Sequence, residues 1–490
     1  MKKEKSLTVN FIMNIILSMS AFIFPLITFP YVSRVLLPIG TGKVSFANSI
    51  IAYFALFAQL GIPTYGIRAC AIVRDDKEKL TKTVQELLII NTIISVLVYI
   101  VFIIALFTVP KMRSDSTLFL ITSTTIFFNV IGVEWLYKAL EQYSYITIRS
   151  IIFKFIGLIL MFILVKNSSD YVWYGFITIF AASASNIFNF INLHKYVSLK
   201  PVGNYNFKVH LKAVTIFFAM SCATTIYTNL DSVMIGFIKG ATENGYYNAA
   251  VRIKSILVSI VTSLGAVLLP RASYYLENNY IDEFKKISKK AINFVILISI
   301  PMMIYFIMFA KESILFLAGD SYAKSIAPMQ IIMPTLLFIG LTNIMGIQML
   351  VPLGKEKYVL YSEIAGALID LVLNALLIPH YGAAGAAVGT LVAEVVVWIV
   401  QFKYLKNDII PIFKTIRYPL ILLAAVISAA VAGLTKILDW HPFFILVVSA
   451  ILYFGIYFLV LIIGKESLIL ELKDRFFGKV IEKWKKRNNG

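Results

Sequence analysis

The sequence has few charged residues for its length. Asp, Glu, Lys and Arg make up 14% of the 490 residues, whereas hydrophobic residues make up 59%. Soluble domains carry roughly 25% charged residues. The low charge extends over the whole chain, so the composition indicates an integral membrane protein with no soluble domain between its spans.

Residues that build disulfides, metal sites and catalytic centres are also scarce. Cys70 and Cys222, the only cysteines, lie in or beside apolar stretches and imply neither a disulfide nor a metal framework. Four histidines are predicted to lie in separate loops without ligand spacing: His194, His210, His380 and His441. No P-loop or hydrolase triad is present. The sequence therefore predicts no cofactor, no metal and no enzyme.

The chain has an excess of positive charge, with a formal net charge of +19. A basic soluble protein would suggest nucleic acid as a partner. In membrane proteins, however, Lys and Arg collect in cytoplasmic loops. We therefore expect membrane lipids and not nucleic acid to be in contact with this chain.

The apolar runs predict an all-α protein with about fourteen transmembrane helices, because a spanning helix needs about 20 mainly apolar residues. The runs lie near residues 8–32, 42–66, 85–109, 116–137, 146–165, 171–193, 212–236, 244–269, 291–310, 326–351, 359–378, 383–402, 418–435 and 442–464. Lys and Arg are concentrated in the termini and the even-numbered loops. Both termini are therefore predicted to be cytoplasmic.

Several motifs recur along the chain at a similar spacing. Gly42 and Arg68 match Gly245 and Arg271. Six spans per repeat give two lobes of the same orientation, related by an axis along the membrane normal. We predict an N-terminal lobe over 1–204, a C-terminal lobe over 205–407, two further spans in 408–464 and an amphipathic cytoplasmic tail over 465–490. The tail is expected to lie on the inner leaflet, since apolar residues recur along it every four positions among lysines.

Charged residues near the apolar runs are candidates for a binding cavity, because an ionisable group in the bilayer is costly and usually faces a bundle interior. The candidate cations are Arg34, Lys43, Arg68, Lys154, Arg252, Lys254 and Arg271. Those at span ends could instead extend to the membrane surface. The candidate acids and amide are Asp231, Glu363, Asp370, Asn374 and Glu394. These could bind a coupling ion, H⁺ or Na⁺, or pair with the buried bases; we favour pairing.

Three stretches carry a resemblance to a known family. They are 31–50, with Ser33-Arg34 and Gly40-Thr41-Gly42; 229–250, with Asp231-Ser232 and Gly245-Tyr246; and 374–394, with Gly382-Ala383-Ala384-Gly385. In these the sequence resembles the polysaccharide repeat-unit flippases of the Wzx type, in the multidrug/oligosaccharidyl-lipid/polysaccharide exporter superfamily. The resemblance covers essentially the whole chain. It implies a V-shaped bundle like that of the multidrug exporters, with two six-helix lobes and helices 13 and 14 outside them.

The resemblance also implies a function. Such proteins move an undecaprenyl-pyrophosphate-linked oligosaccharide across the bacterial plasma membrane by alternating access, for capsule, O-antigen or exopolysaccharide synthesis. A cationic cavity suits the pyrophosphate. Expected partners are the lipid-linked substrate and the polymerase and glycosyltransferases of the same pathway. The alternative is a cation-coupled multidrug antiporter of the same superfamily, with an acid-dominated cavity. A membrane glycosyltransferase or polymerase would be expected to carry an outer-loop acidic motif, which this sequence lacks.

Overall fold

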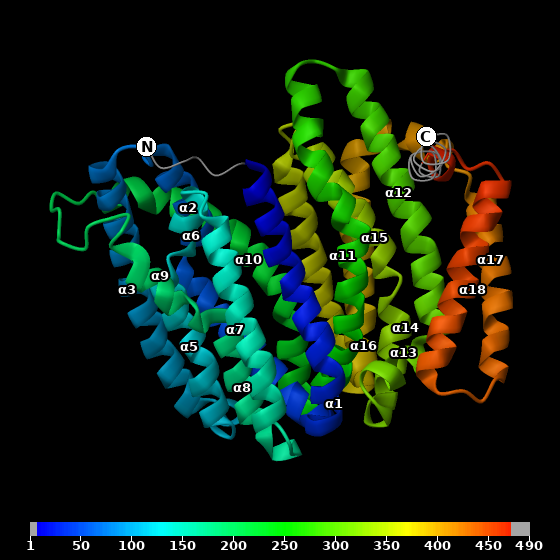
Figure 1. The fold of residues 1–490 in the computed structure, drawn as a ribbon, viewed down its shortest axis with the longest axis horizontal. Coiled ribbons are helices and arrows are strands. Elements are labelled where there is room, and N and C mark those ends of the chain that lie inside the picture. The colour runs from blue at the N-terminus through cyan, green and yellow to red at the C-terminus, as the bar shows by residue number, and fades with distance from the viewer. Residues whose placement is uncertain (1–6, 472–490) are drawn as a thin grey trace, which may run out of the picture. The chain divides into compact units, whose positions relative to one another are not determined.

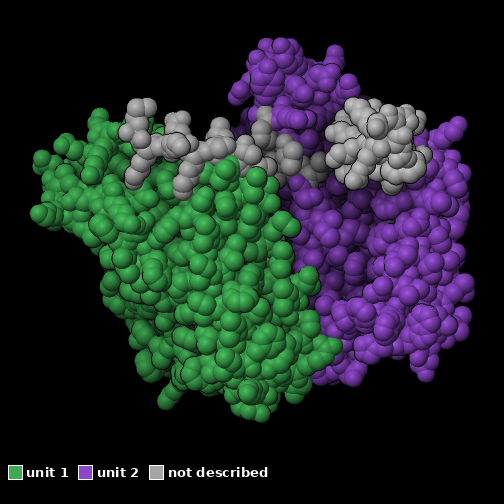
Figure 2. Space-filling model, in the orientation of Figure 1, with its two compact units in different colours: residues 1–248 green, residues 249–490 purple. Residues whose placement is uncertain are grey.

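The computed structural model describes residues 7–471, and every regular element within that range is a helix (Figure 1). The prediction of an all-α protein is thereby confirmed. The chain forms two compact units, residues 1–248 and 249–490 (Figure 2). The predicted lobes, 1–204 and 205–407, were defined by the sequence repeat and have different bounds from these units. The lobes stay a prediction.

Unit 1 holds the helices α1 (Leu7–Gln59), α2 (Ile62–Ile72), α3 (Lys77–Thr108), α4 (Pro110–Arg113), α5 (Ser116–Gly132), α6 (Glu134–Ala139), α7 (Tyr143–Leu164), η1 (Ser168–Asp170), α8 (Tyr171–Ile179), η2 (Phe180–Ala184), α9 (Asn186–Leu193) and α10 (Phe207–Ile238). Helix α11 (Ala241–Glu277) begins in unit 1 and continues into unit 2.

Unit 2 continues with α12 (Ile281–Met308), α13 (Ala310–Leu317), η3 (Asp320–Ser325), α14 (Ile326–Ile332), α15 (Thr335–Thr342), η4 (Asn343–Leu350), α16 (Glu356–Lys414), α17 (Tyr418–Gly433), η5 (Leu434–Ile437) and α18 (Pro442–Ile463).

Nine helical segments in residues 7–471 are long and apolar enough to cross a membrane, or ten if one bent pair is a single span. All fourteen predicted runs lie on helices. Those at 42–66 and 383–402 continue α1 and α16 beyond a kink, while α5 is short and α11 is less apolar. The chain is a multi-pass membrane protein, and the count of fourteen stays a prediction.

Helix α1 contains a sharp break at Leu37. Together with α2 it forms a 61-residue apolar segment, which as one straight helix would be about 90 Å long, roughly three times the hydrocarbon thickness of a bilayer. Leu37 has φ 59° and ψ 175° and is followed by Pro38. Proline disfavours helical backbone in the residue before it. The break therefore divides α1 into two arms, each of spanning length.

The second arm of α1 packs closely against the start of α11 through two glycines. A Cβ atom added to Gly42 would lie 1.8 Å from the carbonyl oxygen of Ala241, and one added to Gly245 would lie 2.0 Å from that of Pro38. Pro38 and Ala241 each precede their glycine by four residues. The contact is thus reciprocal between the two positions that the sequence repeat matches, and both copies require a residue without a side chain there.

Local sequence features determine where helix α3 begins and ends. The Asp76 carboxylate accepts hydrogen bonds from the backbone amides of Glu78 and Lys79, each at 3.1 Å, as an N-cap residue does. The backbone amide of Lys79 and its ammonium group also lower the pKa of Asp76. Pro110 follows the extended residue Val109 and ends the helix.

Helix α9 donates hydrogen bonds to carbonyl groups near the end of α5. The Asn186 side chain donates to the Phe128 oxygen at 3.1 Å, and Asn189 donates to the Gly132 oxygen at 2.6 Å. The last carbonyls of a helix have no partner within the helix. Within unit 1 these asparagines therefore fix α5 against the segment that includes α8, η2 and α9.

In unit 2, α18 packs on α12 through buried tyrosines, and α17 packs on both helices. Tyr457 donates to the Leu297 oxygen and Tyr305 to the Leu446 oxygen, both at 2.9 Å. A buried phenol needs such a partner. Of the two helices predicted to lie outside the lobes, α18 is therefore fixed to α12 by specific polar contacts as well as by apolar packing.

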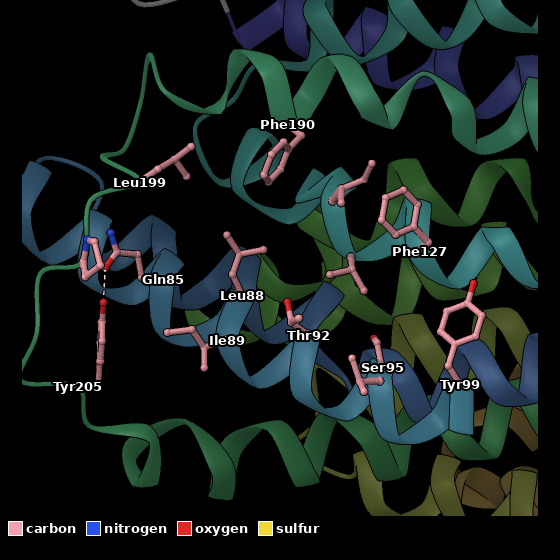
Figure 3. Close-up of a pocket in the computed structure, with 14 residues that line it drawn as sticks. Gln85, Leu88, Ile89, Thr92, Ser95, Tyr99, Phe127, Phe190, Leu199 and Tyr205 are labelled. Atoms are coloured by element: carbon pink, nitrogen blue, oxygen red, sulfur yellow. Dashed lines mark hydrogen bonds between the residues drawn. The ribbon is translucent and has the colours of Figure 1, made fainter. Parts of the chain in front are cut away.

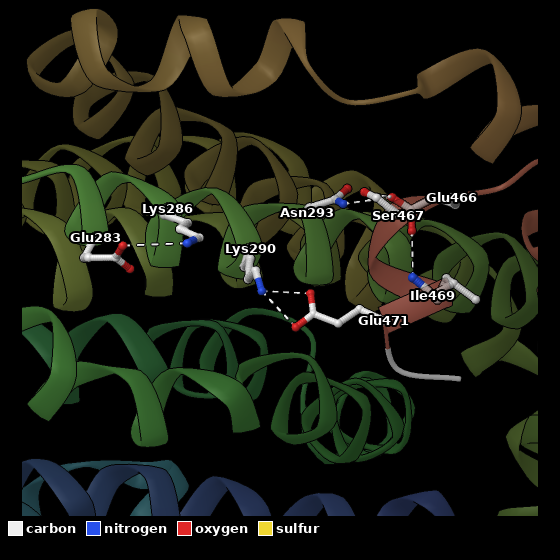
Figure 4. Close-up of polar contacts among 8 residues, drawn as sticks. All are labelled: Glu283, Lys286, Lys290, Asn293, Glu466, Ser467, Ile469 and Glu471. Atoms are coloured by element: carbon white, nitrogen blue, oxygen red, sulfur yellow. Dashed lines mark hydrogen bonds and ion pairs between the residues drawn. The ribbon is translucent and has the colours of Figure 1, made fainter. Parts of the chain in front are cut away.

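The first turn of the predicted amphipathic tail is docked on α12 (Figure 4). The Lys290 ammonium lies 2.8 Å from the Glu471 carboxylate, and Asn293 donates to Glu466 at 3.0 Å. Glu466 also accepts from the backbone amide of Ile469 at 2.9 Å and so caps the turn. The remainder of the predicted tail, residues 472–490, lies outside the described residues.

Candidate functional site

Lys154 lies on α7 within a spanning helix and is half-buried. Its ammonium donates to the Ser20 hydroxyl at 2.7 Å, and that hydroxyl donates to the Leu17 carbonyl at 2.6 Å. The carboxylate of Glu134 adds a favourable electrostatic interaction. A hydroxyl group accepts a hydrogen bond from an ammonium without neutralising its charge, so an anion could still bind a protonated Lys154.

Lys43 and Arg34 both lie on α1, on either side of its break, but in different surroundings. The Lys43 ammonium is 2.7 Å from the Asp115 carboxylate and 4.5 Å from the centre of the Tyr171 ring. Arg34 is exposed and donates to the Pro30 carbonyl at 2.7 Å. Lys43 is thus held in an ion pair that fixes α1 to α8 and the start of α5, whereas Arg34 presents its charge at the helix surface.

The other candidate cations are less buried or lie in unit 2. Arg68 on α2 is exposed, as is Arg271 near the end of α11. Arg252 and Lys254 are half-buried on α11 within unit 2. No single unit brings all seven cations together, and their role in binding stays a prediction.

Among the candidate acids, Asp231 is buried on α10 and accepts a hydrogen bond from the Tyr247 hydroxyl. The neighbouring Ser232 accepts one from the side chain of Asn248 at 3.1 Å. Asp231 therefore belongs to a buried polar contact between α10 and α11 within unit 1.

A second polar cluster lies within α16, between its two arms. Asp370, Asn374 and Glu394 are buried, while Glu363 is half-buried. A Cβ atom added to Gly389 would lie 2.5 Å from the Asn374 side-chain oxygen and 3.0 Å from that of Asp370. The turn at Gly382, with φ 55°, brings Gly389 against Asp370 and Asn374, and Gly389 leaves the space that the two oxygens occupy.

Arg149 on α7 was not predicted from the sequence. It is 8% exposed and donates to the Ser185 carbonyl at 2.8 Å and to the Asn186 side-chain oxygen at 3.4 Å. Ser185 follows the π-helical turn η2, where the usual helical bonds are shifted. The guanidinium therefore satisfies a helix break. The sequence signal that could have identified Arg149 is the presence of a cation within the apolar run 146–165.

Replacing Arg149 with methionine should destabilise unit 1 by about 3 kcal/mol, because the charged donor is lost from two buried acceptors. Thermal unfolding in detergent checks this result. Arg74→Met is the matched control, since Arg74 pairs with Glu141 at an exposed position and such pairs contribute about 1 kcal/mol or less. Equal melting temperatures for the two variants would contradict a structural role for Arg149.

A buried Glu–His pair also escaped the sequence prediction. His210 was expected in a loop, but it lies in the first turns of α10, with its ring 2.8 Å from the Glu86 carboxylate of α3. His380 likewise lies within α16 and not in a loop. The loop prediction was wrong for both because α10 begins, and α16 continues, beyond the apolar runs.

A groove of about 480 Å³ lies in unit 1 beside α3 (Figure 3). Gln85 and Tyr205, joined by a 2.7 Å hydrogen bond, lie at one end, and Tyr99 lies at the other. The walls include the half-exposed side chains of Val96 and Phe127. On a spanning helix such side chains face the hydrocarbon of the bilayer. The groove is therefore a lipid-facing surface with a polar end.

Spanning helices with polar and charged groups satisfied inside the bundle define a polytopic membrane protein. The comparisons with known proteins agree. The family model described as "Polysaccharide biosynthesis protein" matches residues 7–276, more than half of the sequence. The chain belongs to this polysaccharide biosynthesis protein family. The model described as "MatE" matches residues 217–376.

Relatives of known sequence match over most of the chain or over part of it. A putative O-antigen transporter of Escherichia coli strain K12 is 25% identical over 409 residues, which cover 82% of this chain and 97% of the relative. A probable low-salt glycan biosynthesis flippase of Haloferax volcanii is 21% identical over 181 residues, 37% of this chain and 38% of the relative. These relatives are named as transporters, in agreement with the prediction that the chain is not an enzyme.

Solved structures show the same fold. The lipid II flippase MurJ in an inward closed conformation has a TM-score of 0.73 at 16% identity, covering 94% of this chain and 100% of that chain. A multidrug transporter of the MATE family in an inward-facing conformation has a TM-score of 0.59 at 14% identity, covering 79% and 96%. The predicted all-helical fold, like that of the multidrug exporters, is confirmed.

Proposed function

We propose that the protein is a flippase that moves undecaprenyl-pyrophosphate-linked oligosaccharide repeat units from the inner to the outer leaflet of a bacterial plasma membrane. Family membership and near full-length relatives that are named as O-antigen transporters carry the proposal. The fold, shared with a lipid II flippase, is compatible with a lipid-borne substrate. The product would be capsule, O-antigen or exopolysaccharide.

The charged groups of unit 1 suit such a substrate. A pyrophosphate carries negative charge and accepts several charge-assisted hydrogen bonds. Lys154 and Arg34 offer donors within or beside spanning helices, and Arg252 offers another in unit 2. Transport would proceed by alternating access, with a rocking motion of the repeats. A coupling ion, H⁺ or Na⁺, would supply the energy, and both termini would lie in the cytoplasm.

The second candidate function is a cation-coupled multidrug antiporter. The match of residues 217–376 to the MatE model supports it, as do the buried acids Asp231 and Asp370. The polysaccharide family covers a longer part of the chain, and the half-buried Lys154 would repel an organic cation. These observations favour the flippase.

Deletion of the gene tests the proposal directly. The flippase function predicts loss of surface polysaccharide and accumulation of lipid-linked repeat units on the cytoplasmic side, with unchanged drug susceptibility. Partner enzymes of the pathway, the glycosyltransferases and the polymerase, should remain active in extracts. A plasmid copy of the gene should restore export. Normal surface polysaccharide with increased sensitivity to cationic drugs would instead support the antiporter.

A further inference from the structure

Three helices of unit 1 meet at a buried pair of titratable side chains. His210 on α10 and Glu86 on α3 are 7% and 6% exposed, and their side chains lie 2.8 Å apart. The other ring nitrogen of His210 lies 2.8 Å from the Tyr65 hydroxyl of α2. Glu86 also accepts a hydrogen bond from the backbone amide of Asn206 at 2.6 Å. None of these groups belongs to the predicted cationic site.

The cluster can hold His210 in either of its protonation states. With neutral His210, Nε2 donates to Glu86 and Nδ1 accepts from the Tyr65 hydroxyl. With protonated His210, Nδ1 donates to the same hydroxyl oxygen, because a phenol is both donor and acceptor. One proton can therefore enter or leave while both ring nitrogens of His210 keep a partner, and the hydroxyl hydrogen of the half-buried Tyr65 turns away from the ring. Histidine is the side chain suited to this exchange near neutral pH.

The same turn of α3 holds the connection between α9 and α10. The Gln85 side chain donates to the carbonyls of Ser198 and Lys200, both at 2.8 Å. Its oxygen accepts from the Val202 amide at 3.2 Å and from the Tyr205 hydroxyl at 2.7 Å. Gln85 and Glu86 together therefore bind residues 198–206 and the first turn of α10 to α3.

Protonation should strengthen this attachment. When His210 is protonated, its hydrogen bond to the Glu86 carboxylate becomes an ion pair within a buried site. Tyr65 is the group that faces the ring from α2, with exposed Arg68 one turn further along. Lys208 and Lys212, on the same helix as His210, are exposed. Glu86 is thus the charge in direct contact with the ring.

We propose that Glu86, His210 and Tyr65 form the binding site for the coupling proton, and that its occupancy controls the attachment of α10 and the preceding connection to α2 and α3. The coupling to transport rests on the proposed flippase function, whereas the proton-dependent attachment does not. The site differs from the acids predicted from the sequence, since Asp231, Asp370 and Glu394 lie in other clusters.

Hydrogen exchange of the full-length protein in detergent tests the attachment. The amides of Val202 and Asn206 report it directly, because both donate to side chains of α3. After correction for intrinsic exchange, their protection should be about tenfold higher at pH 5.5 than at pH 8.5, as expected for a change in one charged hydrogen bond. His210→Gln and Glu86→Gln should remove this pH dependence.

His194→Gln is the matched control. His194 lies near the same connection but is exposed, with its ring on the Ile191 carbonyl, so this variant should keep the wild-type pH dependence. A pH response that persists in His210→Gln, or is absent from the wild type, would overturn the proposal.

Surface polysaccharide provides the second measurement. His210→Gln, at normal protein level, should reduce export about tenfold, whereas His194→Gln should not. A normal export level in His210→Gln would overturn the coupling role. If deletion of the gene left polysaccharide unchanged, the flippase function would fail, and the exchange experiment would still decide whether the site binds a proton.

Discussion

Gly42→Ala is expected to remove most of the folded protein from the membrane. The added Cβ atom would lie 1.8 Å from the Ala241 carbonyl oxygen and 2.7 Å from the backbone nitrogen of Gly245. These are backbone atoms of another helix, so no side-chain rotation relieves the overlap. We expect a loss of about 3 kcal/mol or more, a large part of the roughly 5–15 kcal/mol that stabilises a typical protein.

Gly245→Ala should have a similar effect, because its Cβ atom would lie 2.0 Å from the Pro38 oxygen. Gly455→Ala is the control, since this glycine lies in α18 with no atom within 4 Å of its added Cβ. That variant should be as stable as the wild type or slightly more stable. Yield by size-exclusion chromatography and thermal unfolding measure the result. Equal yields for Gly42→Ala and Gly455→Ala would disprove the contact.

Lys154→Met should lower export of surface polysaccharide by about 10- to 100-fold while the protein remains folded. A charge-assisted hydrogen bond contributes about 1.5–3 kcal/mol, which corresponds to that range in affinity. Lys154→Arg should keep most of the export, because the positive charge remains. Arg34→Ala and Arg252→Ala test the other two predicted contacts in the same assay.

Ser20→Ala separates binding from structure at this site. It removes the hydroxyl that Lys154 contacts but leaves the charge, so we expect nearly normal export. If Lys154→Met and Ser20→Ala reduced export equally, the lysine would serve helix packing and not the substrate. Normal export in Lys154→Met, Arg34→Ala and Arg252→Ala at normal protein levels would reject the predicted cationic site.

Hydropathy was sufficient to predict where the helices lie. Each apolar run of the sequence coincides with helix, since burial in hydrocarbon forces the backbone to satisfy its own hydrogen bonds. The break at Leu37 was less accessible to prediction. Pro38 gave a signal, but Pro25 and Pro30 lie in the same helix and the residues before them keep helical backbone. Which proline ends an arm depends on the packing around it.

The candidate site was harder to predict, because its contacts join distant residues. Lys154 stood out as a cation in an apolar run, and the structure gives it a partner 134 residues away. Glu86 and His210 are 124 residues apart, and each looks like an ordinary polar residue near a span end. Only the fold shows that they are buried together. Patterns within one helix carry no information on such pairs.

The reciprocal glycine contact bears on how the chain evolved. Suppose that an ancestral chain held only one repeat and formed a symmetric dimer. The same glycine would then have contacted its counterpart in the second copy. In such an ancestor any mutation would have altered both sides at once. After gene fusion each side could change alone. Thr41 and Asn244, the residues before the two glycines, show that freedom: Thr41 bonds to its own helix, whereas Asn244 donates across the contact to Gly42.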